Sequence, residues 1–208
     1  YLYKSQKDIE DEAVLYIANY WTNTSAKDVM VLSNCDEVEL FVNGNSIGKL
    51  APNTFENIPH PAFVFKNVKF EEGELKAVGY VDGVSVAEYV RNTPKEASKL
   101  VLSADYNTLT ADGSDFTQVK VELVDENGTV LPYDKSKVRI SVSDLGTFVG
   151  EEEIELEGGH TGFIVQSKYN KAGAITCKAE PVDNDAIEPA TIEIQVTAFD
   201  ESNIVPIS

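Results

Sequence analysis

The chain has 208 residues, of which 42% are hydrophobic and 25% charged, a composition typical of a globular protein with one large or two ordinary domains. Its 35 acidic residues outnumber its 17 basic residues, which gives a formal net charge of −18 at pH 7. Because phosphate binding requires clustered Lys and Arg, we expect neither nucleic acids nor anionic membranes as partners. No apolar run reaches the roughly 20 residues that span a bilayer, so we expect no membrane segment.

The first half of the sequence predicts a series of short β-strands. β-Branched and aromatic residues dominate these segments, and Asn43-Gly44 and Asp82-Gly83 suit two-residue hairpin turns. The predicted strands are Val14–Trp21, Lys27–Ser33, Glu37–Val42, Phe63–Phe70, Glu74–Val81 and Val84–Val90. Long amphipathic helical windows are missing from the sequence, which favours an all-β sandwich.

The strand pattern is interrupted at Arg91–Leu100, which contains Pro94, and we expect a domain boundary there. Apolar and polar residues then alternate in Gln118–Val124, Lys137–Ser143 and Thr191–Thr197, as in antiparallel sheets with one buried face. The predicted fold is therefore all-β, with two tandem immunoglobulin-like β-sandwich domains of about 100 residues each. The predicted domains are residues 1–94 and 95–199, followed by a tail at 200–208.

The sequence contains no recognisable catalytic constellation. Glycoside hydrolysis needs two carboxylates at a defined separation, but the densest acidic segment, Glu151–His160, is typical of a solvated loop leading into a strand. There is no Gly-x-Ser-x-Gly elbow, and the glycine-rich segment Gly158–Phe163 lacks the lysine of a phosphate-binding loop. We therefore expect no catalytic residue in this chain.

Metal binding is also poorly supported by the sequence. Cys35 and Cys177 fall in different predicted domains, so we expect no disulfide between them. Together with His60 and His160 they do not have the spacing of a zinc site. Calcium takes oxygen ligands from flexible loops, and the acidic turns at 111–115 and 182–188 offer some. We interpret these turns as solvated, expect no metal ligands or cofactor, and keep calcium as the alternative.

Aromatic side chains next to amides are the expected features of a carbohydrate site. The one tryptophan of the sequence, Trp21, lies beside Tyr20 and close to Asn23, and these three residues are the candidate carbohydrate-binding set. In a strand Tyr20 and Trp21 would point to opposite faces. Trp21 is then a buried core residue, an exposed sugar platform, or a contact to a neighbouring domain.

The segment VLSNCDEVELFVNGNSIGKL, Val31–Leu50, resembles the C-terminal region of family 2 glycoside hydrolases, the β-galactosidase-like enzymes. GELKAVGYVDGVSVAEYV at Gly73–Val90 and the segment Lys99–Pro132 are also similar to this region, the latter to its immunoglobulin-like domain. The opening LYKSQK resembles the last segment of the family's catalytic barrel, although Lys7 replaces a usual Trp.

The resemblance implies an accessory role. The family's catalytic glutamates lie on a barrel that would precede Tyr1, so none can be assigned here. The leading hypothesis is a non-catalytic β-sandwich fragment of a secreted β-galactosidase-like enzyme, extracellular or periplasmic, which scaffolds an upstream catalytic domain of the same chain. The alternatives are a carbohydrate-binding module with a polysaccharide partner, and a bacterial surface immunoglobulin-like adhesion domain.

Overall fold

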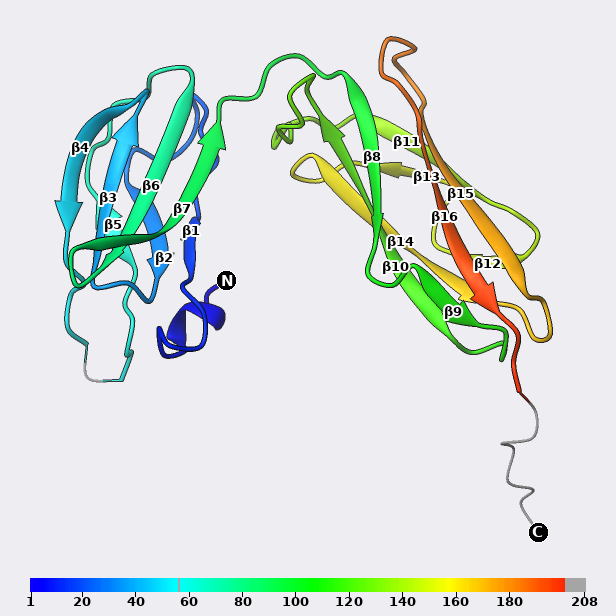
Figure 1. The fold of residues 1–208 in the computed structure, drawn as a ribbon. Coiled ribbons are helices and arrows are strands. Elements are labelled where there is room, and N and C mark those ends of the chain that lie inside the picture. Colours follow the sequence, from blue (N-terminus) through cyan, green and yellow to red (C-terminus); the bar gives the residue numbers. More distant parts are fainter. Residues whose placement is uncertain (56, 201–208) are drawn as a thin grey trace. The chain divides into compact units, whose positions relative to one another are not determined.

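The computed structural model describes residues 1–55 and 57–200, and the chain divides into two compact units between Pro94 and Lys95 (Figure 1). Within the described residues the regular elements are β-strands, apart from one turn of 3₁₀ helix, η1 (Lys4–Gln6). In this part of the chain no helix is long and apolar enough to cross a membrane. The all-β fold predicted from the sequence is confirmed.

The first unit is a sandwich of two antiparallel sheets, whose layers are visible in Figure 1. Its strands are β1 (Leu15–Ile17), β2 (Val29–Ser33), β3 (Glu37–Val42), β4 (Asn45–Leu50), β5 (Phe63–Phe65), β6 (Glu74–Val81) and β7 (Val84–Asn92). One sheet has the order β1-β2-β5 and the other the order β4-β3-β6-β7. Ile17, Val31 and Phe63 of the first sheet pack with Leu40 and Leu75 of the second in one buried core.

Both predicted hairpin turns are present in the first unit. Asn43 and Gly44 have φ of 48° and 79°, and Asp82 and Gly83 have φ of 49° and 76°. Positive φ at both central residues is the requirement of a type I′ turn, whose twist matches that of the strands it joins. The Asn-Gly and Asp-Gly pairs therefore connect β3 to β4 and β6 to β7 for the reason expected from the sequence.

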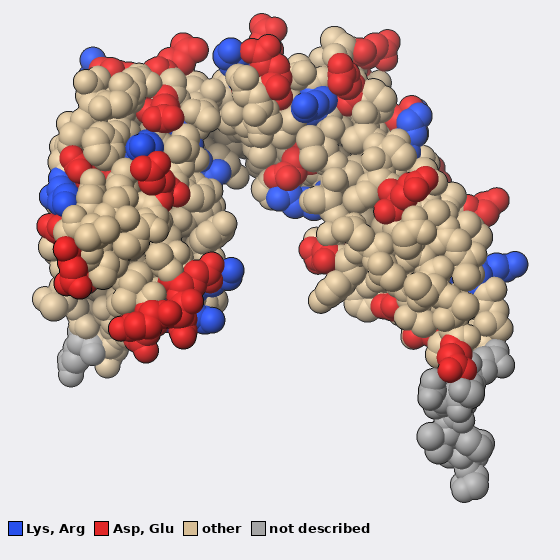
Figure 2. All heavy atoms as spheres, in the orientation of Figure 1, with Lys and Arg blue, Asp and Glu red and all other residues tan. Residues whose placement is uncertain are grey.

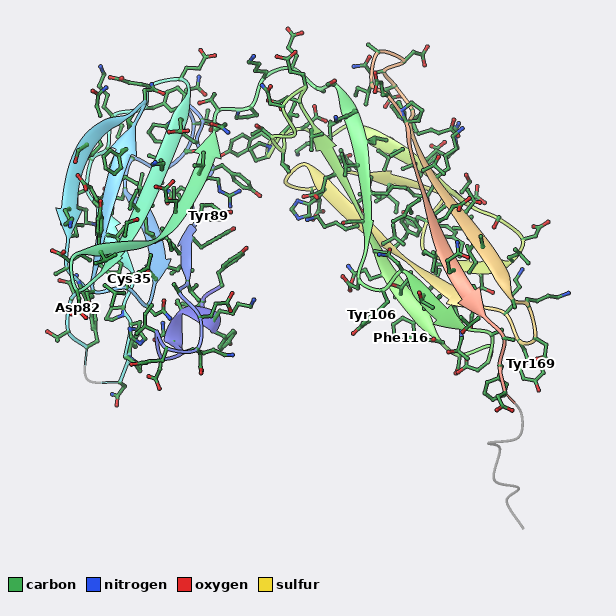
Figure 3. All side chains as sticks on the ribbon, viewed as in Figure 1. Cys35, Asp82, Tyr89, Tyr106, Phe116 and Tyr169 are labelled. Atoms are coloured by element: carbon green, nitrogen blue, oxygen red, sulfur yellow. The ribbon has the colours of Figure 1, made fainter. Side chains whose placement is uncertain are left out.

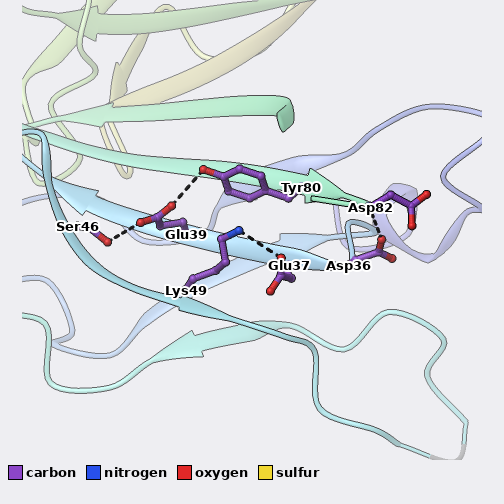
Figure 4. A network of polar contacts seen from close by, with 7 residues as sticks. All are labelled: Asp36, Glu37, Glu39, Ser46, Lys49, Tyr80 and Asp82. Carbon is purple, nitrogen blue, oxygen red and sulfur yellow. Dashed lines mark hydrogen bonds and ion pairs between the residues drawn. The ribbon is translucent and has the colours of Figure 1, made fainter. Parts of the chain in front are cut away.

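The outer face of the sheet β4-β3-β6-β7 carries a network of polar contacts (Figure 4). Ser46 Oγ donates to Glu39 Oε1 at 2.6 Å, and the Tyr80 hydroxyl donates to Glu39 Oε2 at 3.1 Å. Lys49 Nζ lies 3.2 Å from Glu37 Oε2 and 3.6 Å from the centre of the Tyr80 ring. The hydrogen bond from Ser46, with that from Tyr80, holds the pKa of Glu39 below its usual value. These contacts link β4, β3 and β6 on the solvated side.

Three strands of the first unit are shorter than predicted: β2 begins at Val29 rather than Lys27, and β1 and β5 each end several residues early. β1 ends at Ile17 rather than Trp21, because the Asn19 side chain replaces the backbone in pairing with β2: Met30 N–H donates to Asn19 Oδ1 at 2.7 Å and Asn19 Nδ2 to Asp28 O at 3.0 Å. β5 ends at Phe65 rather than Phe70, since Asn67 adopts a φ of 53° and donates its N–H to Asp28 Oδ1 at 3.0 Å. Side-chain hydrogen bonds of this kind compete with strand pairing.

The second unit is also a sandwich. Its strands are β8 (Lys99–Ala104), β9 (Thr108–Thr110), β10 (Phe116–Val124), β11 (Lys137–Val142), β12 (Gly146–Val149), β13 (Glu153–Glu155), β14 (His160–Ser167), β15 (Gly173–Pro181) and β16 (Ala190–Thr197). The sheets have the orders β12-β14-β10-β8 and β13-β11-β15-β16-β9, with β9 and β16 parallel. Val121, Leu123 and Phe163 of one sheet pack with Ile140 and Ile175 of the other.

Both cysteines are free and buried, as expected for small apolar core residues. Cys177 lies in the core of the second unit, where burial raises the pKa of its thiol to about 11. Cys35 lies in the first unit, and burial likewise raises the pKa of its thiol. A raised pKa keeps both thiols protonated near neutral pH, which disfavours a role as a nucleophile.

Candidate functional site

In the two acidic turns considered as calcium sites, side-chain oxygens accept backbone N–H groups of the turns themselves. Asp112 Oδ1 accepts the N–H groups of Ser114 and Asp115, each at 2.7 Å, and these hydrogen bonds hold the pKa of Asp112 below its usual value. In the later turn Asn184 Oδ1 accepts the Ala186 N–H at 3.0 Å. Among the residues that the structure describes, no three His, Cys, Asp or Glu side chains are grouped as metal ligands.

The two histidines lie in different units. In the first unit, the backbone N–H of His60 donates to Gln6 Oε1 at 3.2 Å. In the second unit, the ring Nδ1 of His160 lies 3.1 Å from Gly158 O. The acidic segment before His160 forms the strand β13, with Leu156 fully buried and the glutamates exposed, as predicted. This segment does not enclose a carboxylate in an apolar pocket.

Trp21 is buried, with only 2% of its surface exposed. Its indole Nε1–H donates to Glu71 O at 3.0 Å, and its ring centre lies 5.0 Å from that of Phe70 at an angle of 55°. The ring is therefore part of the core and does not present an open face on which a sugar could stack.

Trp21 also lines a cavity of 260 Å³ at the surface of the first unit, which we call the Trp21 pocket. Its walls come from the segment after β1 and the segment after β5. Trp21, Val68 and Phe70 provide its apolar lining, and Asn23, Lys27, Asn67 and Lys69 its longer polar side chains. The pocket therefore combines an apolar base with amides and ammonium groups, as small-molecule sites commonly do.

Backbone hydrogen bonds hold the two walls of the Trp21 pocket together. Val68 N–H donates to Lys27 O at 2.8 Å, and the Asp28 carboxylate accepts the Asn67 N–H at 3.0 Å and Lys66 Nζ at 2.8 Å. The bond to Lys66, and then that to Asn67, lowers the pKa of Asp28. The walls are thus fixed by contacts that do not use the side chains facing the cavity.

Tyr20 does not line the Trp21 pocket. It belongs to a separate tyrosine–arginine cluster, which consists of Tyr1, Tyr16, Tyr20, Tyr89 and Arg91. The guanidinium carbon of Arg91 lies 5.1, 5.7 and 5.2 Å from the ring centres of Tyr16, Tyr20 and Tyr89, and its Nη2 donates to the Tyr16 hydroxyl at 2.8 Å. The three candidate residues therefore divide: Trp21 and Asn23 share a pocket, and Tyr20 contacts a different group.

The second unit exposes aromatic side chains that the sequence analysis did not single out. Tyr106, Phe116 and Tyr169 are 68%, 57% and 52% exposed (labelled in Figure 3). Tyr106 N–H donates to Thr117 Oγ1 at 2.9 Å, which brings it next to the start of β10. The alternation along β10 would have placed Phe116 on the solvated face, because Thr117 and Val119 are buried.

A second cavity, of 480 Å³, lies in the second unit and is lined by Gln118, Lys120, Glu155, Glu157 and His160 among others. It mixes charges of both signs, and Lys120 Nζ is already 2.8 Å from Glu122 Oε1. On the face of the molecule shown in Figure 2, acidic residues are scattered over both units with fewer basic ones between them. Neither observation favours a strongly charged binding surface in the second unit.

Comparison with known proteins identifies relatives of both units. Residues 100–193 match the family described as glycoside hydrolase family 2 C-terminal domain 5, and residues 25–87 match a domain of unknown function, DUF4982. The predicted resemblance to the C-terminal accessory region of family 2 glycoside hydrolases is confirmed.

Two curated β-galactosidases align with most of this chain. It is 34% identical to a β-galactosidase of Thermoanaerobacter pseudethanolicus over 86% of its length and 26% of that protein. It is 35% identical to the β-galactosidase BoGH2A of Bacteroides ovatus over 95% of its length and 22% of that protein. The chain thus spans about a quarter of the length of the curated relatives that it matches.

A solved structure supports the same assignment. A glycosyl hydrolase family 2 member from Bacteroides cellulosilyticus superimposes with a TM-score of 0.70 at 27% identity, over 86% of this chain and 24% of that one. Sequence and fold therefore both relate this accessory region to parts of larger family 2 enzymes.

Proposed function

We propose that the chain is a non-catalytic β-sandwich region of a secreted β-galactosidase-like enzyme and supports an upstream catalytic barrel of the same protein. The observation that carries the proposal is the match of residues 100–193 to a family 2 C-terminal domain, in a chain that spans about a quarter of its β-galactosidase relatives. A region of this kind contributes packing surface and stability to the enzyme, and the reacting groups come from elsewhere in the protein.

The chemistry of the described residues supports this division of labour. Asp28, Asp112 and Asp125 accept backbone hydrogen bonds in turns, and such bonds stabilise the charged form of a carboxylate. A general acid in glycoside hydrolysis needs the opposite, a carboxyl group whose pKa is raised. These three carboxylates are therefore better suited to structure than to proton transfer.

The test compares the 208-residue chain with the full-length protein on aryl β-D-galactosides and aryl β-D-glucuronides. We expect turnover by the full-length protein and none by the 208 residues alone. A full-length protein from which these residues are deleted should lose thermal stability or activity if they support the barrel. Turnover by the isolated chain above the buffer rate, or an unaffected deletion protein, would contradict the proposal.

Two further points follow from the same proposal. An adhesion protein would carry more copies of the second unit and no barrel, whereas the match of residues 100–193 to a glycoside hydrolase domain favours the enzyme. The full-length reading frame distinguishes the two arrangements directly.

We also propose that the parent enzyme acts outside the cytoplasm, in the periplasm or beyond the cell. Fractionation of cells that express the enzyme would test this localisation.

A further inference from the structure

We propose that the Trp21 pocket binds a single sugar unit that carries an anionic substituent, a carboxylate or a sulfate. The pocket volume of 260 Å³ lies just below the range of about 300–1,000 Å³ typical of drug-sized ligands, which suits one sugar ring. This binding role is independent of the support of a catalytic domain proposed above.

The lining of the pocket has the chemistry that a sugar requires. Phe70, which is only partly buried, offers apolar surface for the C–H groups of a ring, and the buried Trp21 and Val68 form the base behind it. Among the described residues, the side-chain amides of Asn23 and Asn67 and the ammonium group of Lys27 make no hydrogen bond to the protein; all three lie on residues that line the pocket. Amides both donate and accept, so they match the hydroxyl groups of a sugar.

The charge of the lining selects an anionic sugar. Both charged residues that line the pocket are lysines, Lys27 and Lys69, although acidic residues outnumber basic ones by 35 to 17 in the whole chain. Lys69 Nζ lies 3.3 Å from Glu71 Oε1, but these side chains are 85% and 49% exposed. An exposed ion pair contributes little stability, so Lys69 can exchange Glu71 for a ligand at low cost.

The pocket is also preorganised. The Lys27 carbonyl accepts the Val68 N–H at 2.8 Å, and the Trp21 indole is anchored to Glu71 O at 3.0 Å. Neither bond needs to break when a ligand enters. A site whose walls are already fixed loses less conformational entropy on binding, which favours measurable affinity for a small ligand.

The experiment uses the tryptophan itself as the probe, because Trp21 is the one tryptophan of the chain and lines the pocket. Its fluorescence and the NMR signal of its indole N–H are followed while the 208-residue chain is titrated with matched ligands: galactose, galacturonate and galactose 6-sulfate, and the corresponding glucose series. We expect saturable changes with the anionic sugars and affinities at least about tenfold weaker for the neutral ones. Comparison of galacturonate with galactose 6-sulfate shows whether the pocket prefers a carboxylate or a sulfate substituent.

Two variants and a control locate the interaction. Lys27→Gln should reduce the affinity for the anionic sugars more than that for the neutral sugars, whereas Lys135→Gln, the same change at an exposed position of the second unit, should leave both unchanged. Asn67→Gly removes the side-chain amide, and glycine readily adopts the φ of 53° found at this position. This variant should lower the affinity for all the sugars to the same extent. Well-dispersed NMR spectra confirm that the variants are folded.

Equal affinity for neutral and anionic sugars, unchanged binding by Lys27→Gln, or no saturable binding at all would overturn the proposal. Because no turnover is measured, these results are independent of the enzyme assays that test the supporting role of the chain.

Discussion

The two units are both β-sandwiches, but they use polar side chains differently. In the first unit, Asn19, Asp28 and Asn43 bond to backbone groups 11, 39 and 31 residues away and so hold separate segments together. In the second unit, Asp112 and Asp134 bond to N–H groups two or three residues ahead and so close local turns, although Asp125 also accepts the N–H of Lys95, 30 residues earlier. Side chains that replace strand pairing leave irregular segments at the surface, and the Trp21 pocket forms between two of them. The comparison shows why the pocket with unused polar groups lies in the first unit.

The largest expected effect tests whether each unit depends on its own core. Leu40 on β3 and Leu123 on β10 are both fully buried, one in each core. We expect Leu40→Ala and Leu123→Ala each to lower the free energy of unfolding by about 2–5 kcal/mol, because each leaves a cavity. Hydrogen exchange measured by NMR should show faster exchange only in the unit that carries the substitution. Equal acceleration in both units would mean that the cores are not separate.

The next substitution, Gly73→Ala, tests the long-range hydrogen bonds made by side chains of the first unit. Gly73 has a φ of 125°, and a Cβ atom there would overlap with Asn43 Oδ1. That oxygen accepts the Glu74 N–H at 2.8 Å, so Gly73→Ala would displace it. We expect a loss of about 1–3 kcal/mol in the free energy of unfolding, measured by denaturant titration.

Gly128→Ala in the second unit is the matched control for this substitution. Gly128 has a φ of 84° with open space where a Cβ would stand, so only backbone strain of about 1 kcal/mol is expected. If the two substitutions cost the same, the contact between Asn43 and the segment before β6 does not contribute, and the contrast drawn between the units is wrong.

Much of the fold was predictable from the sequence because burial follows the period of a strand. Val38, Leu40 and Val42 alternate with solvated residues, and β3 has the bounds predicted for it. The ends of β1 and β5 were not predictable, since Asn19 and Asn67 act through partners that are distant in the sequence. A propensity for strand says nothing about which side chain will displace the backbone.

The candidate site was predictable only in part for the same reason. Trp21 and Asn23 were singled out together and line one pocket, but Lys27 and Asn67 gave no signal, because Asn67 approaches only after the chain has passed through β2 to β5. Tyr20 was grouped with Trp21 by adjacency, yet it faces Arg91 of β7. Adjacent residues that point to opposite faces belong to different sites.

An effect of similar size concerns the buried turn at Asp125 in the second unit. Asp125 is fully buried, and its carboxylate accepts the N–H groups of Lys95, Asn127 and Thr129 at 2.9, 2.9 and 2.8 Å. Burial alone would raise its pKa, but these hydrogen bonds hold the pKa below the ordinary value of 3.8. Asp125→Asn should cost about 1–3 kcal/mol near neutral pH, because the amide NH₂ would face backbone donors.

The pH dependence of this loss follows from the direction of the pKa shift. A carboxyl group with a lowered pKa stabilises the fold fully above its unfolded value and loses that contribution as the pH falls through its folded value. The difference between the native chain and Asp125→Asn should therefore be constant above about pH 5 and shrink below 3.8. Asp185→Asn, at an exposed position, serves as the control. A difference that persists unchanged in acid would show that the loss is steric.

The smallest expected effect returns to the first unit and its tyrosine–arginine cluster. Arg91→Met keeps an unbranched apolar stem but removes the guanidinium that lies near three tyrosine rings and bonds to Tyr16 and Ile17 O. We expect a loss of about 1 kcal/mol in the free energy of unfolding.

The same substitution should also change the titration of Tyr89. Burial raises the pKa of Tyr89 while the positive charge of Arg91 opposes that shift, so the substitution should raise this pKa further. Ultraviolet titration of the tyrosines measures the change, and Lys76→Met on the neighbouring strand β6 is the control. A Tyr89 titration that does not move would mean that Arg91 acts through packing alone.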